Sequence, residues 1–162
     1  MADMTPGPNP PDEIYVMIHV SSGSKYYYST EKGVLTISKA FANPLTAAYG
    51  LIPATHHTDA EPLDVLVLVS EPPMPCTLMP ARPIGLVRLE GEGKIDDKIL
   101  AVCSLDSEFE GVEDIADVPK RMLSQLTDSI KEDWVTKITW LDAAKAKKAI
   151  EHAIGLYKRE ND

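Results

Sequence analysis

Five consecutive aliphatic residues at positions 65–69 constrain the fold of this chain more than any other feature. Because the run does not alternate apolar with polar side chains, it predicts a strand that is buried on both faces. Asp64 stands directly before the run, and Pro72, Pro73 and Pro75 follow it. Proline has no backbone N–H for a strand ladder, so the strand should end before residue 72. We therefore expect a central strand over residues 64–69.

Strand-like segments fill most of the chain before residue 105, and helical spacing comes only later. Besides the central strand, we expect strands over residues 14–20, 25–29, 34–37, 84–89, 99–103 and 134–140. An apolar stripe at helical spacing follows Pro119, with Asp117 as its cap, and a second helix should begin after Asp142. Strands that precede helices, without regular βαβ alternation, indicate an α+β fold. We expect a compact antiparallel sheet or small barrel with helices at one side.

The size and charge of the chain exclude several classes of protein. Its 162 residues suit one domain, which we expect at residues 13–162 behind a proline-rich, extended leader at residues 1–12. The net charge of −9 argues against a nucleic-acid partner, because a phosphate backbone requires a basic face. No apolar run reaches the roughly 20 residues of a membrane span, and the first residues lack the pattern of a signal peptide. Cys76 and Cys103 have no metal-type spacing, so we interpret them as free thiols of a cytoplasmic protein.

Three carboxylates, Asp59, Glu61 and Asp64, lie within six residues at the start of the central strand. Carboxylates crowded beside a desolvated strand are unfavourable unless a cation pairs with them, and Mg²⁺ prefers carboxylate and water oxygens. The stretch therefore indicates either a cation site or a polar turn that leads into the core. His56 and His57 precede it, and we interpret them as loop residues rather than as ligands of a transition metal.

A second acidic loop, residues 90–98, reads Glu-Gly-Glu-Gly-Lys-Ile-Asp-Asp-Lys. Its glycines allow a tight turn, and it carries four carboxylates. By itself such a loop is usually the solvated tip of a hairpin. If both acidic loops lie at the same mouth of a small barrel, however, they can face one another across it.

The acidic stretch DAEPLDVLV resembles the signature of the family I soluble inorganic pyrophosphatases, which reads Asp-x-Asp-Pro-x-Asp followed by Val-Leu-Val. The resemblance continues in order from about residue 12 to residue 158. It includes Lys25 within KYYY, Tyr-Gly-Leu-Ile at 49–52, Arg-Pro-Ile-Gly at 82–85, and the second acidic loop with Lys98. It implies a five-stranded OB-like β-barrel with two helices packed on its side.

The resemblance also implies a function, namely the Mg²⁺-dependent hydrolysis of pyrophosphate to two phosphates by a metal-activated water. Asp59, Asp64 and Asp96 correspond to the carboxylates of the tightest metal site. The residues that correspond to catalytic and phosphate-contacting groups are Glu61, Lys25, Lys39, Tyr49, Lys98 and Lys131. Members of the family are homo-oligomers, often hexamers in bacteria, so we expect the same assembly here.

Two acidic positions depart from the family pattern. Glu61 stands where the family has the Asp that orients or deprotonates the nucleophile, and its carboxylate is one methylene further out. Gly91 stands where the family has a further metal-binding Asp. Glu90, Glu92 or Asp97 could supply a ligand in its place.

Other departures lie elsewhere in the expected site. His19 and Tyr27 each replace a glutamate, which removes acceptors for outer metal ions or their waters. Lys39 replaces an arginine, so the charge remains but the bidentate grip on phosphate is lost. Ile130 replaces a tyrosine beside Lys131. The sequence therefore predicts an intact inner metal site and weakened outer ones.

Two other functions stay open on the sequence. One is a degenerate, non-catalytic pyrophosphatase-like protein that binds metal or phosphate, or acts as a partner subunit of an active relative. The other is a nucleic-acid-binding OB module, for which Tyr26, Tyr27 and Tyr28 offer rings. That module also needs a basic face, which the net charge of −9 argues against. A replacement carboxylate near Gly91 would favour the active enzyme over the degenerate protein.

Overall fold

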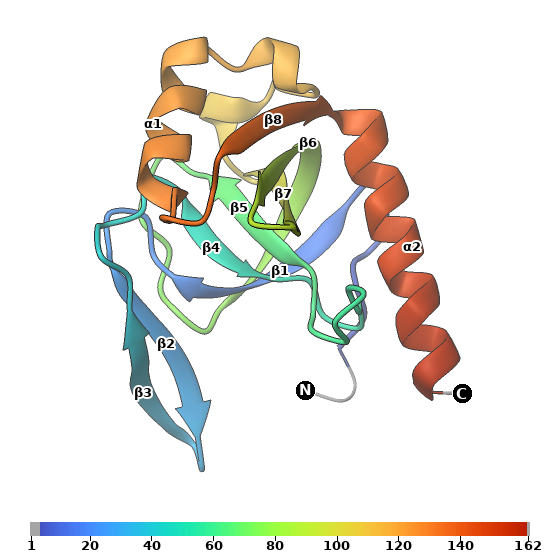
Figure 1. Cartoon of the computed structure of the whole chain (residues 1–162). Coiled ribbons are helices and arrows are strands. Elements are labelled where there is room, and N and C mark those ends of the chain that lie inside the picture. The colour runs from blue at the N-terminus through green and yellow to red at the C-terminus, as the bar shows by residue number, and fades with distance from the viewer. Residues whose placement is uncertain (1–3, 162) are drawn as a thin grey trace.

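The computed structural model describes residues 4–161, and within that range the chain forms eight strands and two α-helices (Figure 1). The strands are β1 (Ile14–Val20), β2 (Tyr26–Glu31), β3 (Val34–Ala40), β4 (Ala48–Leu51), β5 (Asp64–Leu68), β6 (Leu78–Gly91), β7 (Lys94–Cys103) and β8 (Lys137–Asp142). The helices are α1 (Lys120–Ile130) and α2 (Ala143–Asn161), with short 3₁₀ turns at Ser107–Phe109 and Ile115–Asp117 before α1.

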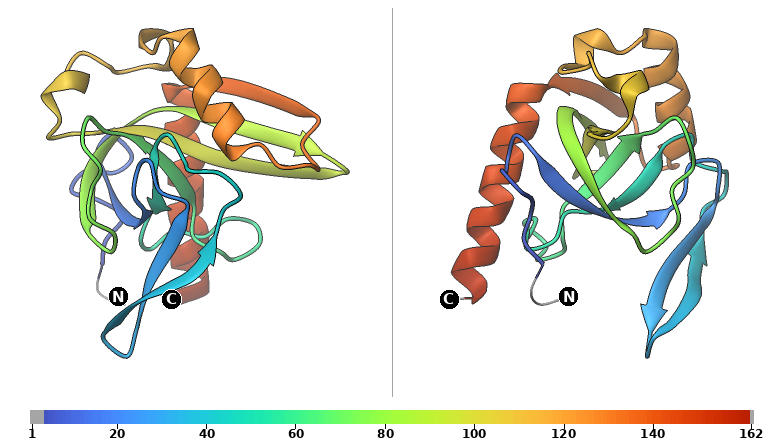
Figure 2. Two further views of the ribbon diagram at one scale, coloured as in Figure 1. Left: turned by 90° about the vertical axis from the view of Figure 1, so that its left-hand side faces the viewer. Right: turned by 180° about the vertical axis from the view of Figure 1, so that it is seen from behind.

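Five strands close into a ring in the order β1-β4-β5-β7-β6, because β6 pairs with β7 along one part of its length and with β1 along another. β8 extends the sheet beside β6. β2 and β3 form a separate hairpin that projects from the ring on the side away from α2 (Figures 1 and 2). The expected α+β class, with an OB-like ring of five strands and two helices at its side, is confirmed.

The central strand β5 is buried on both faces, as its unbroken apolar sequence predicts. Val65 and Val67 belong to a core cluster that includes side chains of α2, whereas Leu66 and Leu68 belong to a second cluster that includes side chains of α1. β5 pairs antiparallel with β4 and parallel with β7. Asp64, its first residue, therefore belongs to a strand that is hydrogen-bonded along both edges.

The two helices cover the core with the apolar stripes that their sequences predict, and α2 runs along the outside of the ring (Figure 2). The buried residues are Leu126 and Ile130 in α1 and Ala146, Ile150 and Ala153 in α2. The carboxylate of Asp142 accepts the backbone N–H of Lys145 at 3.0 Å. This bond satisfies one of the free donors at the start of α2, so the predicted cap is confirmed.

Several expectations about element boundaries were wrong. The strand expected at 99–103 begins at Lys94 as β7, so residues 94–98 of the second acidic loop lie in a strand rather than in a loop. β6 spans fourteen residues and runs through Pro80 and Pro83, which lie where the strand changes partner from β1 to β7. A missing N–H is tolerated at such a change of partner. The strand expected at 134–140 begins at Lys137, since residues 133–134 form a turn. Asp117 does not cap α1, because its carboxylate accepts backbone N–H groups of the preceding turn, and Pro119 stands at the N-cap without a side-chain hydrogen bond.

The leader expected at residues 1–12 is described from residue 4 onward, and residues 1–3 lie outside the described part. The carbonyl of Pro6 accepts the N–H of Tyr15 in β1 at 2.9 Å, and Asp12 pairs with Lys147 of α2 at 3.0 Å. The segment thus contacts both the ring and α2, and a domain boundary at residue 12 stays a prediction. The helices of residues 4–161 include none with the length and apolar character that crossing a membrane requires.

Candidate active site

Strand register gathers three of the predicted side chains at one end of the ring. Leu66 of β5 and Leu100 of β7 lie side by side in the parallel pair and belong to the same core cluster. Side chains two residues apart on a strand share a face. Asp64, Asp96 and Lys98 therefore lie on the face of Leu66 and Leu100, with Asp64 beside Lys98.

The ammonium of Lys98 lies between two of these carboxylates. Its Nζ is 3.1 Å from Oδ2 of Asp64 and 3.0 Å from Oδ2 of Asp96, and its side chain is 12% exposed. Burial lowers the pKa of Lys98, but the two carboxylates together raise it by more, so the pKa lies above its ordinary value. Lys98 therefore remains charged and holds the ends of β5 and β7 together.

The first acidic loop is held at both ends by one buried hydroxyl. Oγ1 of Thr55 donates to the carbonyl of Ile52 at 2.7 Å and accepts the N–H of Leu63 at 3.1 Å. Within the loop, Oδ1 of Asp59 accepts the N–H of Glu61 at 2.9 Å, as in an Asx-turn. The carboxylate of Asp59 is thereby oriented before the start of β5.

Two adjoining cavities contain most of the predicted site residues. The first, which we term the acidic cavity, has a volume of about 270 Å³. Its predicted residues are Lys39, Tyr49, Asp59, Glu61, Asp64 and Asp96. The second, which we term the lysine cavity, has a volume of about 450 Å³. Its predicted residues are Lys39, Tyr49, Lys98 and Lys131. Because Lys39 and Tyr49 line both cavities, one ligand can reach the carboxylates and the lysines together.

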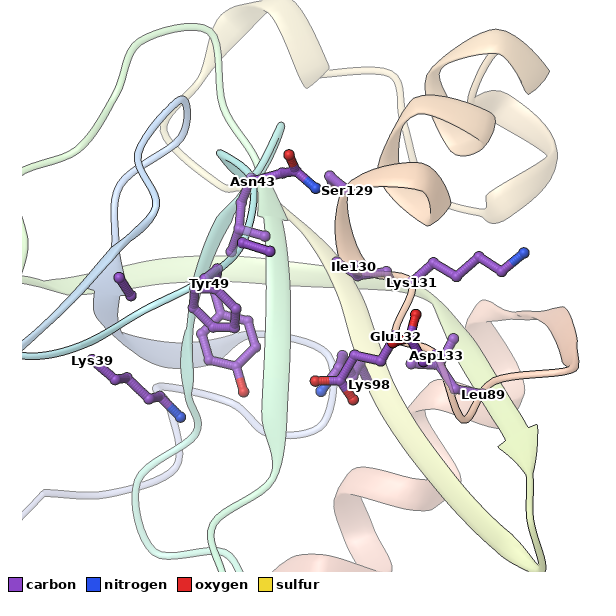
Figure 3. A pocket seen from close by; sticks show the side chains of 14 residues that line it. Lys39, Asn43, Tyr49, Leu89, Lys98, Ser129, Ile130, Lys131, Glu132 and Asp133 are labelled. Carbon is purple, nitrogen blue, oxygen red and sulfur yellow. The ribbon is translucent and has the colours of Figure 1, made fainter.

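Tyr49 lies at the junction of the two cavities. Nζ of Lys98 is 5.4 Å from the centroid of its ring, and Figure 3 shows its hydroxyl directed between Lys39 and Lys98. Burial raises the pKa of Tyr49, and the negative charge of Asp64 raises it further. The phenol therefore keeps its proton and can donate a hydrogen bond to a ligand.

Two of the predicted phosphate-contacting residues, Lys25 and Lys131, lie further from the other site residues. Lys25 is exposed, its Nζ lies over the ring of Tyr26 at 5.9 Å, and it lines neither cavity. Lys131 lines the lysine cavity but is exposed. In Figure 3 its side chain extends away from Tyr49 and Lys98.

Gly91 has no room for the carboxylate that the family pattern has at its position. An ideal Cβ at Gly91 would lie 1.8 Å from the carbonyl oxygen of Trp134. Among the three possible replacements, Asp97 lines the acidic cavity, whereas the two glutamates of the loop line neither cavity. Both oxygens of Asp97 accept from Arg88, at 2.9 and 3.0 Å, so this carboxylate is already paired.

The carboxylates of the acidic cavity suit a hard divalent cation. Asp59, Asp64 and Asp96 line it together, and they offer only oxygen donors, which Mg²⁺ and Ca²⁺ prefer. Across residues 4–161, no three His, Cys, Asp or Glu side chains are grouped closely enough to hold an ion without rearrangement. Asp64 and Asp96 are instead paired with Lys98. The donor set fits a metal ion, provided that these side chains rotate toward it.

Comparison with known proteins identifies the family of this chain. A family model described as inorganic pyrophosphatase matches residues 14–158. The chain belongs to the inorganic pyrophosphatase family. The match covers the ring, α1, α2 as far as residue 158 and both acidic stretches, so the resemblance seen in the sequence is confirmed.

Individual inorganic pyrophosphatases are similar over nearly the whole chain. One from Haloferax volcanii is 36% identical, with 96% of this chain and 94% of the relative covered. One from Agrobacterium fabrum is 33% identical, with 95% of each chain covered. The solved structure of the inorganic pyrophosphatase from Thermus thermophilus has a TM-score of 0.86 at 27% identity, covering 96% of this chain and 97% of that one.

The acidic cavity contains two residues to which the sequence assigned no role in binding or catalysis, although it noted Tyr27 as the replacement of a glutamate. Tyr27 lines it, and burial, followed by the charge of Asp64, raises the pKa of its phenol. His57 also lines it, and its backbone N–H donates to the carbonyl of Glu61 at 2.7 Å. Tyr27 belongs to the projecting hairpin, and no local pattern predicts that its ring reaches the carboxylates of another sheet.

Proposed function

We propose that this protein hydrolyses inorganic pyrophosphate to two phosphates where the acidic and lysine cavities meet, with Mg²⁺ as its metal. The observation that carries the proposal is that Lys39 and Tyr49 line both cavities. A metal-bound substrate with two phosphoryl groups needs oxygen ligands for the cation and positive groups for its own oxygens. Membership of the inorganic pyrophosphatase family supports the same reaction.

The carboxylates divide into metal ligands and a base. Asp59, Asp64 and Asp96 would hold Mg²⁺, which supplies positive charge and lowers the pKa of nearby water. Glu61 shares their cavity and accepts the proton of the attacking water as a general base. The water oxygen bonds to one phosphorus while the bridging P–O bond breaks, and the leaving phosphate keeps the electron pair of that bond.

The cationic side chains act on the phosphoryl groups. Lys39, Lys98 and Lys131 neutralise the charge that the phosphoryl oxygens and the leaving phosphate carry. Tyr49 keeps its proton and donates a hydrogen bond to one of these oxygens. Lys25 belongs to this scheme as a further phosphate contact on the strength of the family resemblance.

The degenerate alternative gains no support from the site. Glu61, the proposed base, lines the same cavity as the three proposed metal ligands, and a protein that only bound metal or phosphate would not need a base there. We therefore propose an active enzyme.

We also propose a cytoplasmic homo-oligomer, with a hexamer as the expected assembly. Both cysteines are free thiols, which suits a reducing compartment. The projecting hairpin exposes three large apolar side chains, those of Val34, Leu35 and Ile37, which suits a surface covered by another subunit. Light scattering of the purified protein tests the assembly, and a monomer would refute it.

Release of phosphate from pyrophosphate in the presence of Mg²⁺ tests the reaction. We expect turnover in the wild type and none above background in Asp64→Asn, which removes the charge of one proposed ligand. Asp128→Asn is the matched control, because Asp128 is an exposed carboxylate of α1, and it should keep full turnover. A wild type that releases no phosphate, or two variants with equal losses, would refute the proposal.

A further inference from the structure

Three of the positions at which this chain departs from the family pattern contact one another beside the acidic cavity. The rings of His19 in β1 and Tyr27 in β2 are stacked, with centroids 4.7 Å apart and planes inclined by 8°. Nζ of Lys39 in β3 lies 4.7 Å from the centroid of the Tyr27 ring, within the range of a cation–π contact. Tyr27 is therefore held between a strand of the ring and the other strand of its own hairpin.

A hydrogen bond fixes the orientation of His19. Its Nδ1 lies 2.7 Å from the carbonyl oxygen of Tyr28. Because a carbonyl oxygen only accepts, Nδ1 carries a proton in this contact. Rotation of the imidazole would break this bond and the stack together, so His19 restricts the position of Tyr27.

Tyr27 adds a third hydrogen-bond donor to one part of the acidic cavity. The cavity is lined by Tyr27, Lys39 and Tyr49 in addition to its carboxylates. The rings of Tyr27 and Tyr49 meet edge to face, with centroids 6.3 Å apart. Two phenols and an ammonium offer protons to a ligand at neutral pH. Such a group suits phosphoryl oxygens, whereas a carboxylate at position 27 would suit a cation or its waters.

We propose that the hydroxyl of Tyr27 donates a hydrogen bond to a phosphoryl oxygen of pyrophosphate in the acidic cavity, and that His19 is the residue that positions Tyr27 for this contact. The identity of the ligand rests on the proposed function. In this scheme the replacement of a carboxylate by Tyr27 exchanges an outer metal contact for a substrate contact. Tyr27 touches the substrate, and His19 acts only through Tyr27.

Calorimetric binding of imidodiphosphate, a pyrophosphate analogue with a nitrogen bridge, tests the role of Tyr27 in the presence of Mg²⁺. Tyr27→Phe removes one hydroxyl and keeps the ring, so the stack on His19 can persist. A hydrogen bond to a charged acceptor predicts a loss of affinity of about 10- to 100-fold. Tyr26→Phe is the matched control, because Tyr26 is on the same strand, is 41% exposed and lines neither cavity. It should bind the analogue as the wild type does.

Binding of Mg²⁺ alone separates a substrate contact from a disturbed metal site. Tyr27→Phe should bind Mg²⁺ with wild-type affinity when no analogue is present. Wild-type affinity of Tyr27→Phe for imidodiphosphate, or equal losses in Tyr26→Phe and Tyr27→Phe, would overturn the proposal, as would a wild type that does not bind the analogue. Phosphate release is measured in parallel. A protein that binds the analogue through Tyr27 and releases no phosphate would refute the proposed function and leave this contact established.

Two substitutions test the positioning role of His19. His19→Phe keeps a ring that can stack on Tyr27, whereas His19→Ala removes the ring. We expect His19→Ala to weaken the binding of imidodiphosphate several-fold and His19→Phe to restore most of it, with melting temperatures compared as a check on folding. Unchanged binding in His19→Ala would overturn the positioning role, and so would an equal loss in the two variants.

Discussion

Replacing Gly91 by aspartate would restore the residue that the family pattern has at this position, and the structure predicts that the restoration fails. An ideal Cβ there would lie 1.8 Å from the carbonyl oxygen of Trp134 and 3.0 Å from the backbone nitrogen of Thr136. Non-bonded carbon atoms are best separated by about 3.5–4.0 Å. Residues 134–136 would therefore have to move before any side chain fits at position 91.

The size of the effect follows from what this movement breaks. The N–H of Thr136 donates to the carbonyl of Glu90 at 2.8 Å, and the loss of one such bond costs about 0.5–1.5 kcal/mol. Overpacking of a filled site costs about 1–3 kcal/mol. We expect the free energy of unfolding to fall by about 1.5–4.5 kcal/mol in total. In a chain of 162 residues this lowers the melting temperature by roughly 5–15 °C.

Urea denaturation of three variants, combined with Mg²⁺ titration, tests this reasoning. Gly91→Ala should lose nearly as much stability as Gly91→Asp, because the clash begins at Cβ. Gly111→Asp is the control, since nothing lies within 4 Å of a Cβ at Gly111, and it should change stability by less than about 0.5 kcal/mol. A Gly91→Asp protein with wild-type stability and tighter Mg²⁺ binding would refute the argument, because the loop would then have moved and supplied the ligand.

Four further predictions concern three charged groups. Lys98→Met leaves Asp64 and Asp96 without their cationic partner, so in the absence of metal it should lower the free energy of unfolding by about 1–3 kcal/mol. Addition of Mg²⁺ in the millimolar range should restore much of the lost stability, as measured by the melting temperature. The pKa of Lys98 is raised in the folded protein, so the stability that its charge contributes should be fully present at pH values below its ordinary pKa of 10.5. This contribution should be lost as the pH rises through the raised pKa, and melting temperatures measured over a pH series test it. Glu61→Gln should lower kcat by about 100-fold or more with little change in Mg²⁺ affinity, as expected for a general base. The backbone N–H of Ala143, at the start of α2, is the chief donor that holds the pKa of Asp114 below its ordinary value of 3.8. Asp114→Ala should therefore lower the free energy of unfolding by about 1 kcal/mol at neutral pH, and by progressively less as the pH falls below 3.8 and through the lowered pKa. Urea denaturation over a pH series measures this difference.

The elements that the sequence predicts best are those whose signal lies within a few neighbouring residues. The unbroken apolar run before Ser70 predicts β5 and its burial on both faces. Helical spacing predicts α1 and α2, and Asp142 predicts the start of α2, because a helix and its cap are made by residues close in the chain. The strand predicted at 84–89 is shorter than β6, which also includes Pro80 and Pro83, where it changes partner from β1 to β7.

The candidate site likewise has one part that a short stretch of sequence predicts and another part that depends on how the strands pair. The acidic stretch around Asp59 and Asp64 indicates either a cation site or a polar turn, and the family resemblance favours the cation site and adds residues from the rest of the chain. The position of Lys98 between Asp64 and Asp96, however, depends on tertiary structure. It follows from the parallel register of β5 and β7, and β6 separates these two strands in the chain. No residue pattern within either strand encodes that register.

Contacts between segments far apart in the sequence account for the remaining features. Composition and local pattern alone predict one domain of α+β class, its central strand, its helices and a cluster of acidic residues before that strand. The stack of His19 on Tyr27 and the close approach of Trp134 to Gly91 arise where separate loops and strands meet. These contacts depend on how all strands close into the ring, because each local segment is compatible with several pairings until its neighbours exclude them. The substitutions of glutamate by His19 and Tyr27 therefore read as losses in the sequence, and only the closed ring reveals them as one cluster beside the acidic cavity.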